Sequence, residues 1–282
     1  MILEKYIPGQ EKNAAFAAIS DMVGGITDGR SYAGMMARRI SGAVAHECHD
    51  TFYVAHEDGQ AASRLWMGWG RHKDAIGNWG NFYTVESYRR RGIGGGLLKL
   101  WYEDFRSVTE PPLCFLCTTG SKDITDLYGR FGFRPAIEGR EYGPLYRPNG
   151  DSPDTFREFY ISYYQPSKVL YLRPATVEYR HEIDCLLRFV YVDMGLSFGL
   201  GGLASIEEGL LREPHRTHML FSEDGHCVGW KFDDQLQMHP MYEHCCIEYE
   251  AHGYDRQTRG NYETVRPPIL PPLYLHCRPL PP

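Results

Sequence analysis

The apolar positions in the first hundred residues switch between two spacings. In some segments apolar residues recur every three or four positions, which is typical of amphipathic helices. In others apolar and aromatic residues are dense and bounded by turn residues such as Glu57-Asp58-Gly59, which predicts a hairpin. We therefore predict strands at residues 2–7, 51–55, 62–69 and 78–85, and helices at 12–22 and 31–45.

The next seventy residues continue the alternation. A helix is predicted to begin at Gly92, the first glycine of a glycine-rich run, because Ile93, Leu97, Trp101 and Phe105 then share one face. The stretch 144–153, rich in Pro, Asn, Gly and Asp, predicts a loop. The remaining expectations are helices at 92–108 and 123–131, the second between Ser121 as N-cap and Gly132 as stop, and strands at 113–118, 133–139 and 157–165.

The pattern begins again after Pro166-Ser167-Lys168, which we interpret as a linker at 166–169. The order strand, helix, glycine-rich turn, helix and hairpin repeats that of the first part, which indicates a diverged internal repeat. Seven prolines in the last sixteen residues favour an extended tail. The predicted elements are strands at 170–173, 218–221 and 227–232, helices at 176–191 and 205–212, and a turn at Gly199, Gly201 and Gly202.

Composition narrows the class of protein. The chain has 282 residues, 43% of them apolar, which is enough for two ordinary globular domains. Its net charge of -6 gives no reason to expect nucleic-acid binding. We expect no signal segment, no membrane span and a cytoplasmic location, since charge appears by Glu4 and no long uncharged apolar run exists. The eight scattered cysteines favour reduced thiols.

The segment Arg89-Arg90-Arg91-Gly92-Ile93-Gly94 carries the clearest chemistry. It follows a predicted strand and opens a predicted helix, whose first turn leaves backbone N–H groups unpaired. Glycines let an anion approach that backbone, and arginines add bidentate phosphate donors. A Rossmann loop would need a glycine at Leu97, and a Walker A loop would need Gly-Lys-Ser/Thr. The combination therefore indicates a different pyrophosphate site.

The pattern Arg-x-x-Gly-x-Gly resembles the acetyl-coenzyme A motif of the GNAT N-acetyltransferase superfamily. Leu127-Tyr128-Gly129-Arg130-Phe131-Gly132-Phe133 resembles the second signature of that family, in which the tyrosine is commonly the general acid. A phenol can protonate a departing thiolate. Many members have an asparagine where this chain has Ser121, so that pantetheine contact is in doubt. The resemblance implies Tyr128 as catalytic acid and a cofactor site at Tyr83, Thr84, Val85, Arg89, Arg90, Arg91, Gly92, Ile93, Gly94, Gly95, Gly96 and Ser121.

The resemblance also implies an architecture. We expect an α/β (α+β) fold with a mixed, mostly antiparallel central sheet flanked by helices. Residues 1–165 would form the catalytic GNAT domain, in which the fourth strand splays from the fifth. Residues 170–282 resemble only the front half of the family and lack Arg-x-x-Gly-x-Gly. We therefore expect a smaller, degenerate GNAT-like or accessory domain there, with a Pro-rich tail and no cofactor.

The base and the acceptor are less defined. Glu86, His72 and Glu141 are candidate bases only by their expected position near strand ends. The Cys114-Phe115-Leu116-Cys117 run has CxxC spacing but lies in an apolar strand, and the clusters at 46–49 and 239–246 follow no recognised ligand spacing. We therefore expect no metal. Trp66 and Trp69 should occupy opposite faces of one strand, and some aromatic residues could line an acceptor pocket.

Two functions fit these patterns. The first is an enzyme that transfers acetyl from acetyl-CoA, as co-substrate, to a primary amine by direct attack in a ternary complex. The second is a non-catalytic acyl-CoA-binding regulatory module with a C-terminal interaction domain. The expected acceptor is a small molecule or a peptide amine, and a homodimer is possible.

Overall fold

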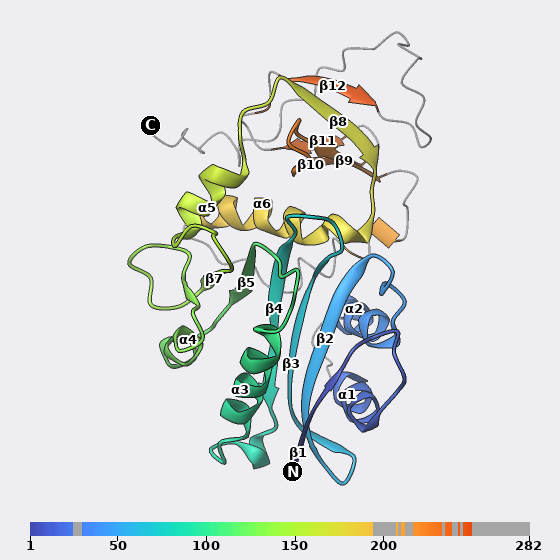
Figure 1. Cartoon of the computed structure of the whole chain (residues 1–282), viewed down its shortest axis with the longest axis vertical. Helices are drawn as coiled ribbons and strands as arrows, with labels where there is room; N and C mark the ends of the chain where they lie inside the picture. Colours follow the sequence, from blue (N-terminus) through green and yellow to red (C-terminus); the bar gives the residue numbers. More distant parts are fainter. Residues whose placement is uncertain are drawn as a thin grey trace.

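The computed structural model of the chain describes residues 1–24, 30–193, 207, 210–211, 217–232, 235–238, 242 and 245–249. Its first sheet has the strand order β1-β2-β3-β4-β5-β7-β6 (Figure 1). Every pairing is antiparallel except that of β4 with β5. The strands are β1 (Ile2–Tyr6), β2 (Cys48–Glu57), β3 (Gln60–Gly70), β4 (Ile76–Thr84), β5 (Cys114–Thr118), β6 (Arg134–Pro135) and β7 (Pro144–Pro148). The predicted mixed, mostly antiparallel sheet is confirmed.

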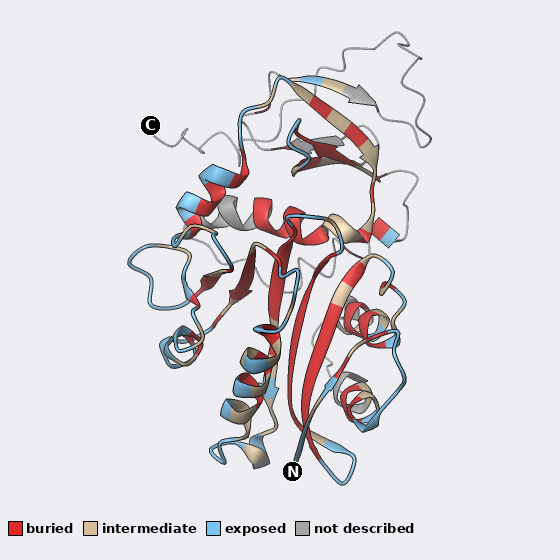
Figure 2. Cartoon of the chain, in the orientation of Figure 1, coloured by how far each residue is buried: buried red, intermediate tan, exposed pale blue. Residues whose placement is uncertain are grey.

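Helices cover both faces of this sheet. One face packs on α1 (Ala14–Gly24) and α2 (Arg30–Ser41), and the other on α3 (Ile93–Phe105) and α4 (Lys122–Gly129). Trp66 belongs to the core under α1 and α2, whereas Trp69 belongs to the core under α3. The predicted opposite faces are confirmed, and both rings are buried because each face has its own helical cover (Figure 2).

The second sheet has the order β11-β10-β9-β8-β12. Four consecutive antiparallel strands form a meander, as do the first four strands of the chain. The fifth strand pairs in parallel with β8, at the edge opposite β11. The elements are β8 (Val169–Pro174), η2 (Val177–Tyr179), α6 (Arg180–Asp193), β9 (Thr217–Phe221), β10 (Cys227–Phe232), β11 (Gln235–Met238) and β12 (Cys246–Tyr249). That this part is a degenerate GNAT-like lobe stays a prediction.

Two local predictions are wrong. Residues 157–165 were expected to be a strand but form α5 (Phe156–Tyr163). The Thr155 hydroxyl accepts from the Glu158 N–H, and the Glu158 carboxylate accepts from the Thr155 N–H, which is a capping box that starts a helix. The second error lies in 144–153, where the predicted loop contains β7, and the strand expected at 133–139 shrinks to β6.

Some expectations concern residues outside the described part. Residues 207, 210 and 211 are helical, as expected for 205–212, but the rest of that segment is not described. The glycine turn at 199–202 and the proline-rich tail also lie outside the described residues. Within the described residues, no helix has both the length and the apolar character that crossing a bilayer requires.

The two sheets share a hydrophobic core. One cluster combines Ile76, Cys114 and Leu116 of the first sheet with Leu170 and Leu220 of the second. In Figure 1, α6 lies between the sheets, where it contacts β10 on one side and β3 and β4 on the other. The boundary at 166–169 falls between α5 and β8 and stays a proposal, but the two parts do not pack as independent cores.

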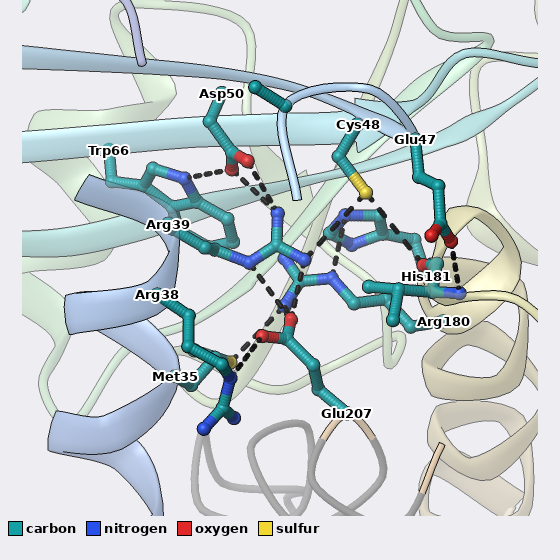
Figure 3. A network of polar contacts seen from close by, with 12 residues as sticks. Met35, Arg38, Arg39, Glu47, Cys48, Asp50, Trp66, Arg180, His181 and Glu207 are labelled. Carbon is teal, nitrogen blue, oxygen red and sulfur yellow. Dashed lines mark hydrogen bonds and ion pairs between the residues drawn. The ribbon is translucent and has the colours of Figure 1, made fainter. Parts of the chain in front are cut away.

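A buried network of charges also joins the parts (Figure 3). Arg39 on α2 donates to both oxygens of Asp50 at 2.7 Å and to Glu207 at 2.9 Å. Arg180 on α6 also donates to Glu207, and all of these side chains are 0–1% exposed. Burial alone would raise the pKa of Glu207, but Arg180 and Arg39 lower it, so this carboxyl group stays ionised.

A second polar junction lies nearby. The Glu47 carboxylate accepts from the Val177 N–H at 2.7 Å, at the start of η2. A Cβ on Gly70 would lie 2.2 Å from the Glu178 carbonyl oxygen, so only glycine allows η2 to pack this closely on β3. The metal-like pattern at 46–49 therefore includes a residue that anchors the C-terminal part.

The network generates a prediction about stability. Glu207→Gln keeps the side-chain volume but removes the charge that compensates Arg39 and Arg180. Breaking one partner of a buried ion group costs about 3–5 kcal/mol, so we expect a loss of that order in the free energy of unfolding, measured by urea titration. Glu103→Gln removes an exposed partner of Lys99 and should change nothing measurable. Equal stability of Glu207→Gln and the native protein would contradict the prediction.

A second prediction concerns pH. The His72 ring stacks on Tyr179 with centroids 4.2 Å apart, and its Nε2 lies 3.2 Å from the Glu182 carboxylate. Burial alone would lower the pKa of His72, but Glu182 raises it to about 9. Because the folded pKa exceeds the ordinary value of about 6.5, this contribution to stability is complete below that value and is lost as pH rises through about 9. Thermal unfolding from pH 6 to 10 should show this loss in the native protein but not in His72→Gln.

Candidate functional site

The pairing of β4 with β5 stops early. Only the first three residues of β4 pair with β5, and the last pair is Asn78 with Leu116. Beyond this point β4 continues to Thr84 beside β3 alone. The expected splay between the fourth and fifth strands is therefore present. Among the described strands, none pairs with this edge of β4 over its second half.

A bulge in β4 lies within the unpaired stretch. Arg64 of β3 pairs with Tyr83 and Trp66 pairs with Gly80, so Leu65 alone opposes two residues of β4. One of these is Asn81, whose φ of +51° is left-handed. The Arg64 guanidinium donates to the Asn81 side-chain oxygen at 2.9 Å and fixes this conformation. Bulges bend a strand, so this one accompanies the departure of β4 from β5.

The predicted backbone contacts of β4 need a correction of detail. The Val85 N–H bonds to Ala62, and the Tyr83 carbonyl accepts from the Ser63 hydroxyl, so both residues face β3. Backbone groups alternate between the two edges of a strand. Thr84 and Phe82 are therefore the residues that face the open edge. The Thr84 carbonyl already accepts from the Arg89 guanidinium at 3.0 Å.

The loop after β4 turns sharply into α3. It contains η1 (Glu86–Tyr88), followed by Arg90 and Gly92, which have φ of +61° and +78°. The left-handed region costs a non-glycine residue about 1–2 kcal/mol, so Arg90 is held in a conformation that glycine would prefer. All three arginines of the loop, Arg89, Arg90 and Arg91, are exposed. Their charge therefore faces solvent at the start of a helix.

The glycines of the loop meet different structural requirements. A Cβ on Gly94 would lie 2.9 Å from the Phe82 ring, so this residue permits α3 to pack on β4. Gly92 has a left-handed φ and is the N-cap of α3. A Cβ on Gly95 would meet nothing within 4 Å, and Gly95 is exposed with an ordinary φ. Packing therefore does not explain Gly95, whereas the approach of a ligand to the helix start would.

The first turn of α3 has the donors that such a ligand needs. The Gly96 N–H makes the first helical bond, to the Gly92 carbonyl. The preceding N–H groups, those of Ile93, Gly94 and Gly95, point out of the helix end, as they do in any helix. Together with the positive end of the helix dipole, such N–H groups favour the approach of an anion. The predicted residues from Arg89 to Gly96 are thus brought together around one helix start.

Tyr128 lies on α4, which follows β5. It is 6% exposed, and its ring packs edge-on against Trp79 with centroids 4.6 Å apart. Trp79 is the first residue of β4 beyond the pairing with β5, so Tyr128 stands at the point where the strands part. Burial raises the pKa of the Tyr128 phenol above its ordinary value. The phenol therefore keeps its proton at neutral pH and has an O–H to donate.

The aromatic residues of β3 and β4 are mostly core, as expected, since Trp66, Trp69 and Trp79 are buried. Trp79 contacts Trp101 and Phe133 as well as Tyr128. Tyr83 is the exception, with 42% of its surface exposed, and it packs under the Arg89 guanidinium at 5.8 Å. Trp79, Trp101, Phe133 and Tyr128 belong to the core under α3, whereas Tyr83 pairs with Arg64 on the other face of β4.

Ser121 is the N-cap of α4 and is exposed, but its side chain makes no capping hydrogen bond. Its hydroxyl therefore has no structural task in the helix start.

The three candidate bases lie at different places around the first sheet. Glu86 is exposed in η1, directly before the arginine loop, and Glu141 is exposed between β6 and β7. His72 precedes the first residue of β4 and is held by Glu182 and Tyr179, so it lies at the end of β4 opposite the loop. The CxxC run is core, as predicted: Cys114 is 0% and Cys117 2% exposed. Among the described residues, no group of His, Cys, Asp and Glu has the arrangement of a metal site.

The comparison with known families decides the assignment. Residues 48–135 match the family model described as acetyltransferase (GNAT) domain. This part of the chain is a GNAT domain. The match includes the divergent strands, the arginine-glycine loop and Tyr128. No curated protein matches the chain.

Solved structures that resemble the GNAT domain share little sequence with it. An acyl-CoA N-acyltransferase from Pseudomonas aeruginosa is 13% identical, with a TM-score of 0.38, over 52% of this chain and 99% of that one. Escherichia coli ElaA is 11% identical, with a TM-score of 0.38, over 52% and 99%. A GNAT family acetyltransferase from Brucella melitensis in complex with acetyl-CoA is 18% identical, with a TM-score of 0.35, over 52% and 89%. The assignment rests on the family model alone.

Sequence reasoning missed two residues of this region. Asn78 marks the end of strand pairing, and Asn81 forms the bulge. A signal was available for Asn81, because asparagine tolerates a left-handed conformation and is rare within strands. Asn78 carries no such signal, since its importance depends on where β5 ends.

Proposed function

We propose that this protein is an acetyl-CoA-dependent N-acetyltransferase that acts on a primary amine by direct attack in a ternary complex. The observation that carries the proposal is the arrangement around the divergence of β4 from β5. The glycine-rich start of α3 lies at one end of the open strand edge, and the buried Tyr128 lies at the other. A long ligand with a pyrophosphate and a thioester fits this arrangement.

The residues divide the work as follows. The N–H groups of Ile93, Gly94 and Gly95, with Arg89 to Arg91, would hold the pyrophosphate. The open edge of β4 at Phe82 and Thr84 would pair with pantetheine, and an N–H there would polarise the thioester carbonyl. The exposed Ser121 hydroxyl is free to contact the ligand in place of the asparagine of other members.

Tyr128 would act when the carbon–sulfur bond breaks. The amine nitrogen attacks the carbonyl carbon, the thiolate leaves, and the phenol transfers its proton to sulfur. A thiolate with an ordinary pKa of about 8.5 is a weaker base than the Tyr128 phenolate. Proton transfer from Tyr128 to sulfur is therefore unfavourable by itself. It is driven by the two steps that follow, in which solvent returns a proton to Tyr128 and the new amide nitrogen loses its second proton. Ions are costly in the aromatic surroundings of Tyr128, so the phenolate is short-lived.

The first functional prediction tests the phosphate site. Gly95→Glu should strengthen α3, because glutamate has the better helix propensity and its charge suits a helix N-terminus. The same charge should repel the pyrophosphate and raise the calorimetric Kd for CoA at least tenfold. Lys99→Glu, one turn further along α3, should change the Kd less than threefold. An unchanged Kd in a folded Gly95→Glu protein would exclude this loop as the phosphate site.

The second functional prediction tests the acid. Tyr128→Phe removes the hydroxyl and keeps the ring that packs on Trp79, so fold and acetyl-CoA affinity should barely change. Turnover should fall about a hundredfold, the range for a positioned general acid, without a rise in the KM for acetyl-CoA. Ser121→Ala should lower activity less. Full activity of Tyr128→Phe would assign the proton to another group, and a native protein that binds acetyl-CoA but acetylates no amine would indicate a binding module.

A further inference from the structure

The C-terminal part places charged groups against the GNAT sheet on the face opposite α3. Arg180, His181, Glu182 and Asp184 of α6 are each 0% exposed. Figure 2 shows this buried stretch of α6 where it meets β4. This is also the face of the sheet that α2 covers, because the Arg180 guanidinium lies 3.2 Å from the sulfur of Met35 on α2. α6 therefore covers the side of β4 that remains once α3 and α4 occupy the other.

Two carboxylates of α6 reach β4 next to the divergence. Glu182 accepts from the Ile76 N–H at 2.8 Å, and Asp184 accepts from the Asn78 amide at 3.1 Å. Asn78 is the last residue of β4 that pairs with β5. Because Ile76 and Asn78 are two positions apart, their Cα atoms lie about 7 Å apart on one face of the strand. The carboxylates therefore stand beside the point where the acyl group is expected, behind the strand.

Two acceptor atoms at this place have no donor within the described residues. They are Oδ1 of Asn78, which is 1% exposed, and Oε2 of Glu182, which is 0% exposed. A buried polar atom that lacks its hydrogen bond costs about 1–3 kcal/mol, and more when the group is charged. Both atoms are acceptors, so the missing partner must be a donor. A primary amine supplies up to three N–H groups on one atom.

We propose that α6 completes the acceptor side of the transfer site. Asn78 Oδ1 and Glu182 Oε2 receive N–H groups of the acceptor amine at the divergence of β4 and β5. The C-terminal part then forms one side of the acceptor site. The expected substrate is an amine that is cationic in solution. The inference rests on the proposed acetyl transfer and adds the residues that select its acceptor.

The chemistry balances without another reactant. The ammonium gives one proton to the Glu182 carboxylate, and the neutral nitrogen forms a bond to the thioester carbon. The carbon–sulfur bond then breaks, and sulfur takes a proton from Tyr128. The new amide nitrogen loses its second proton, which restores Tyr128 through solvent, and Glu182 returns its own proton to solvent. The products are the acetamide, CoA and one proton.

The test compares Glu182→Gln and Asn78→Ala with the native protein. Steady-state rates are measured with spermidine, lysine methyl ester and 2-phenylethylamine, and acetyl-CoA binding is measured by calorimetry. Glu182→Gln keeps an acceptor for the Ile76 N–H and should raise the amine KM at least tenfold, with acetyl-CoA affinity unchanged. Asn78→Ala should raise the amine KM several-fold. Glu178→Gln, which neutralises a neighbouring carboxylate on η2, is the matched control and should behave as native.

The outcomes separate the two proposals. An amine KM within twofold of native in both variants, with acetyl-CoA affinity intact, overturns the inference and leaves acetyl transfer standing. Should the native protein release no thiol with any amine, acetyl transfer fails, and calorimetry of the three amines into the protein–CoA complex decides the amine site. Amine binding that is present in the native complex and lost in both variants supports the proposed amine site. Absence of amine binding to the native complex overturns it. Where Glu182→Gln fails to fold, Asn78→Ala and Asn78→Ser decide in the same way.

Discussion

The candidate site depends on one constraint, the failure of β4 to follow β5 beyond Asn78. A paired strand has no backbone groups to offer a ligand, because every N–H and C=O is engaged. The bulge at Asn81 bends β4 within the sheet, and the bond from Arg64 holds the bulge in place. The arginine loop and Tyr128 lie at opposite ends of this open edge. One extended ligand could therefore contact both.

Burial of charge explains why the C-terminal part belongs to this arrangement. Arg39 of α2 and Arg180 of α6 share Glu207, and none of the three is exposed to water. A buried charge without a partner is strongly unfavourable, so the GNAT sheet cannot release the second part without a large penalty. The same docking places Glu182 of α6 on the Ile76 N–H. The contact that holds the parts together thus also sets the surroundings of the divergence.

Much of this could be predicted from the sequence, but only where the causes are local. The strand–loop–helix from β4 to α3 follows from apolar periodicity and from glycines at a helix start. Residues 157–165 were predicted to be a strand, but the capping box at Thr155 and Glu158 was a local signal for a helix. No local pattern could show that Asn78 ends the β5 pairing, or that Glu182 would contact Ile76, which lies 106 residues earlier. Such contacts depend on how two sheets dock.

The second sheet shows why repetition of elements does not repeat the site. Both sheets contain a four-stranded antiparallel meander, and each carries one parallel strand. In the GNAT sheet the parallel strand stands beside the fourth strand of the meander, where a partial pairing leaves an open edge. In the second sheet it stands beside the first, so the described strands there contain no divergence next to β11. The sequence of that part also lacks the Arg-x-x-Gly-x-Gly loop. What the described strands of the second sheet contribute is packing, because α6 contacts β10 on one side and β4 on the other.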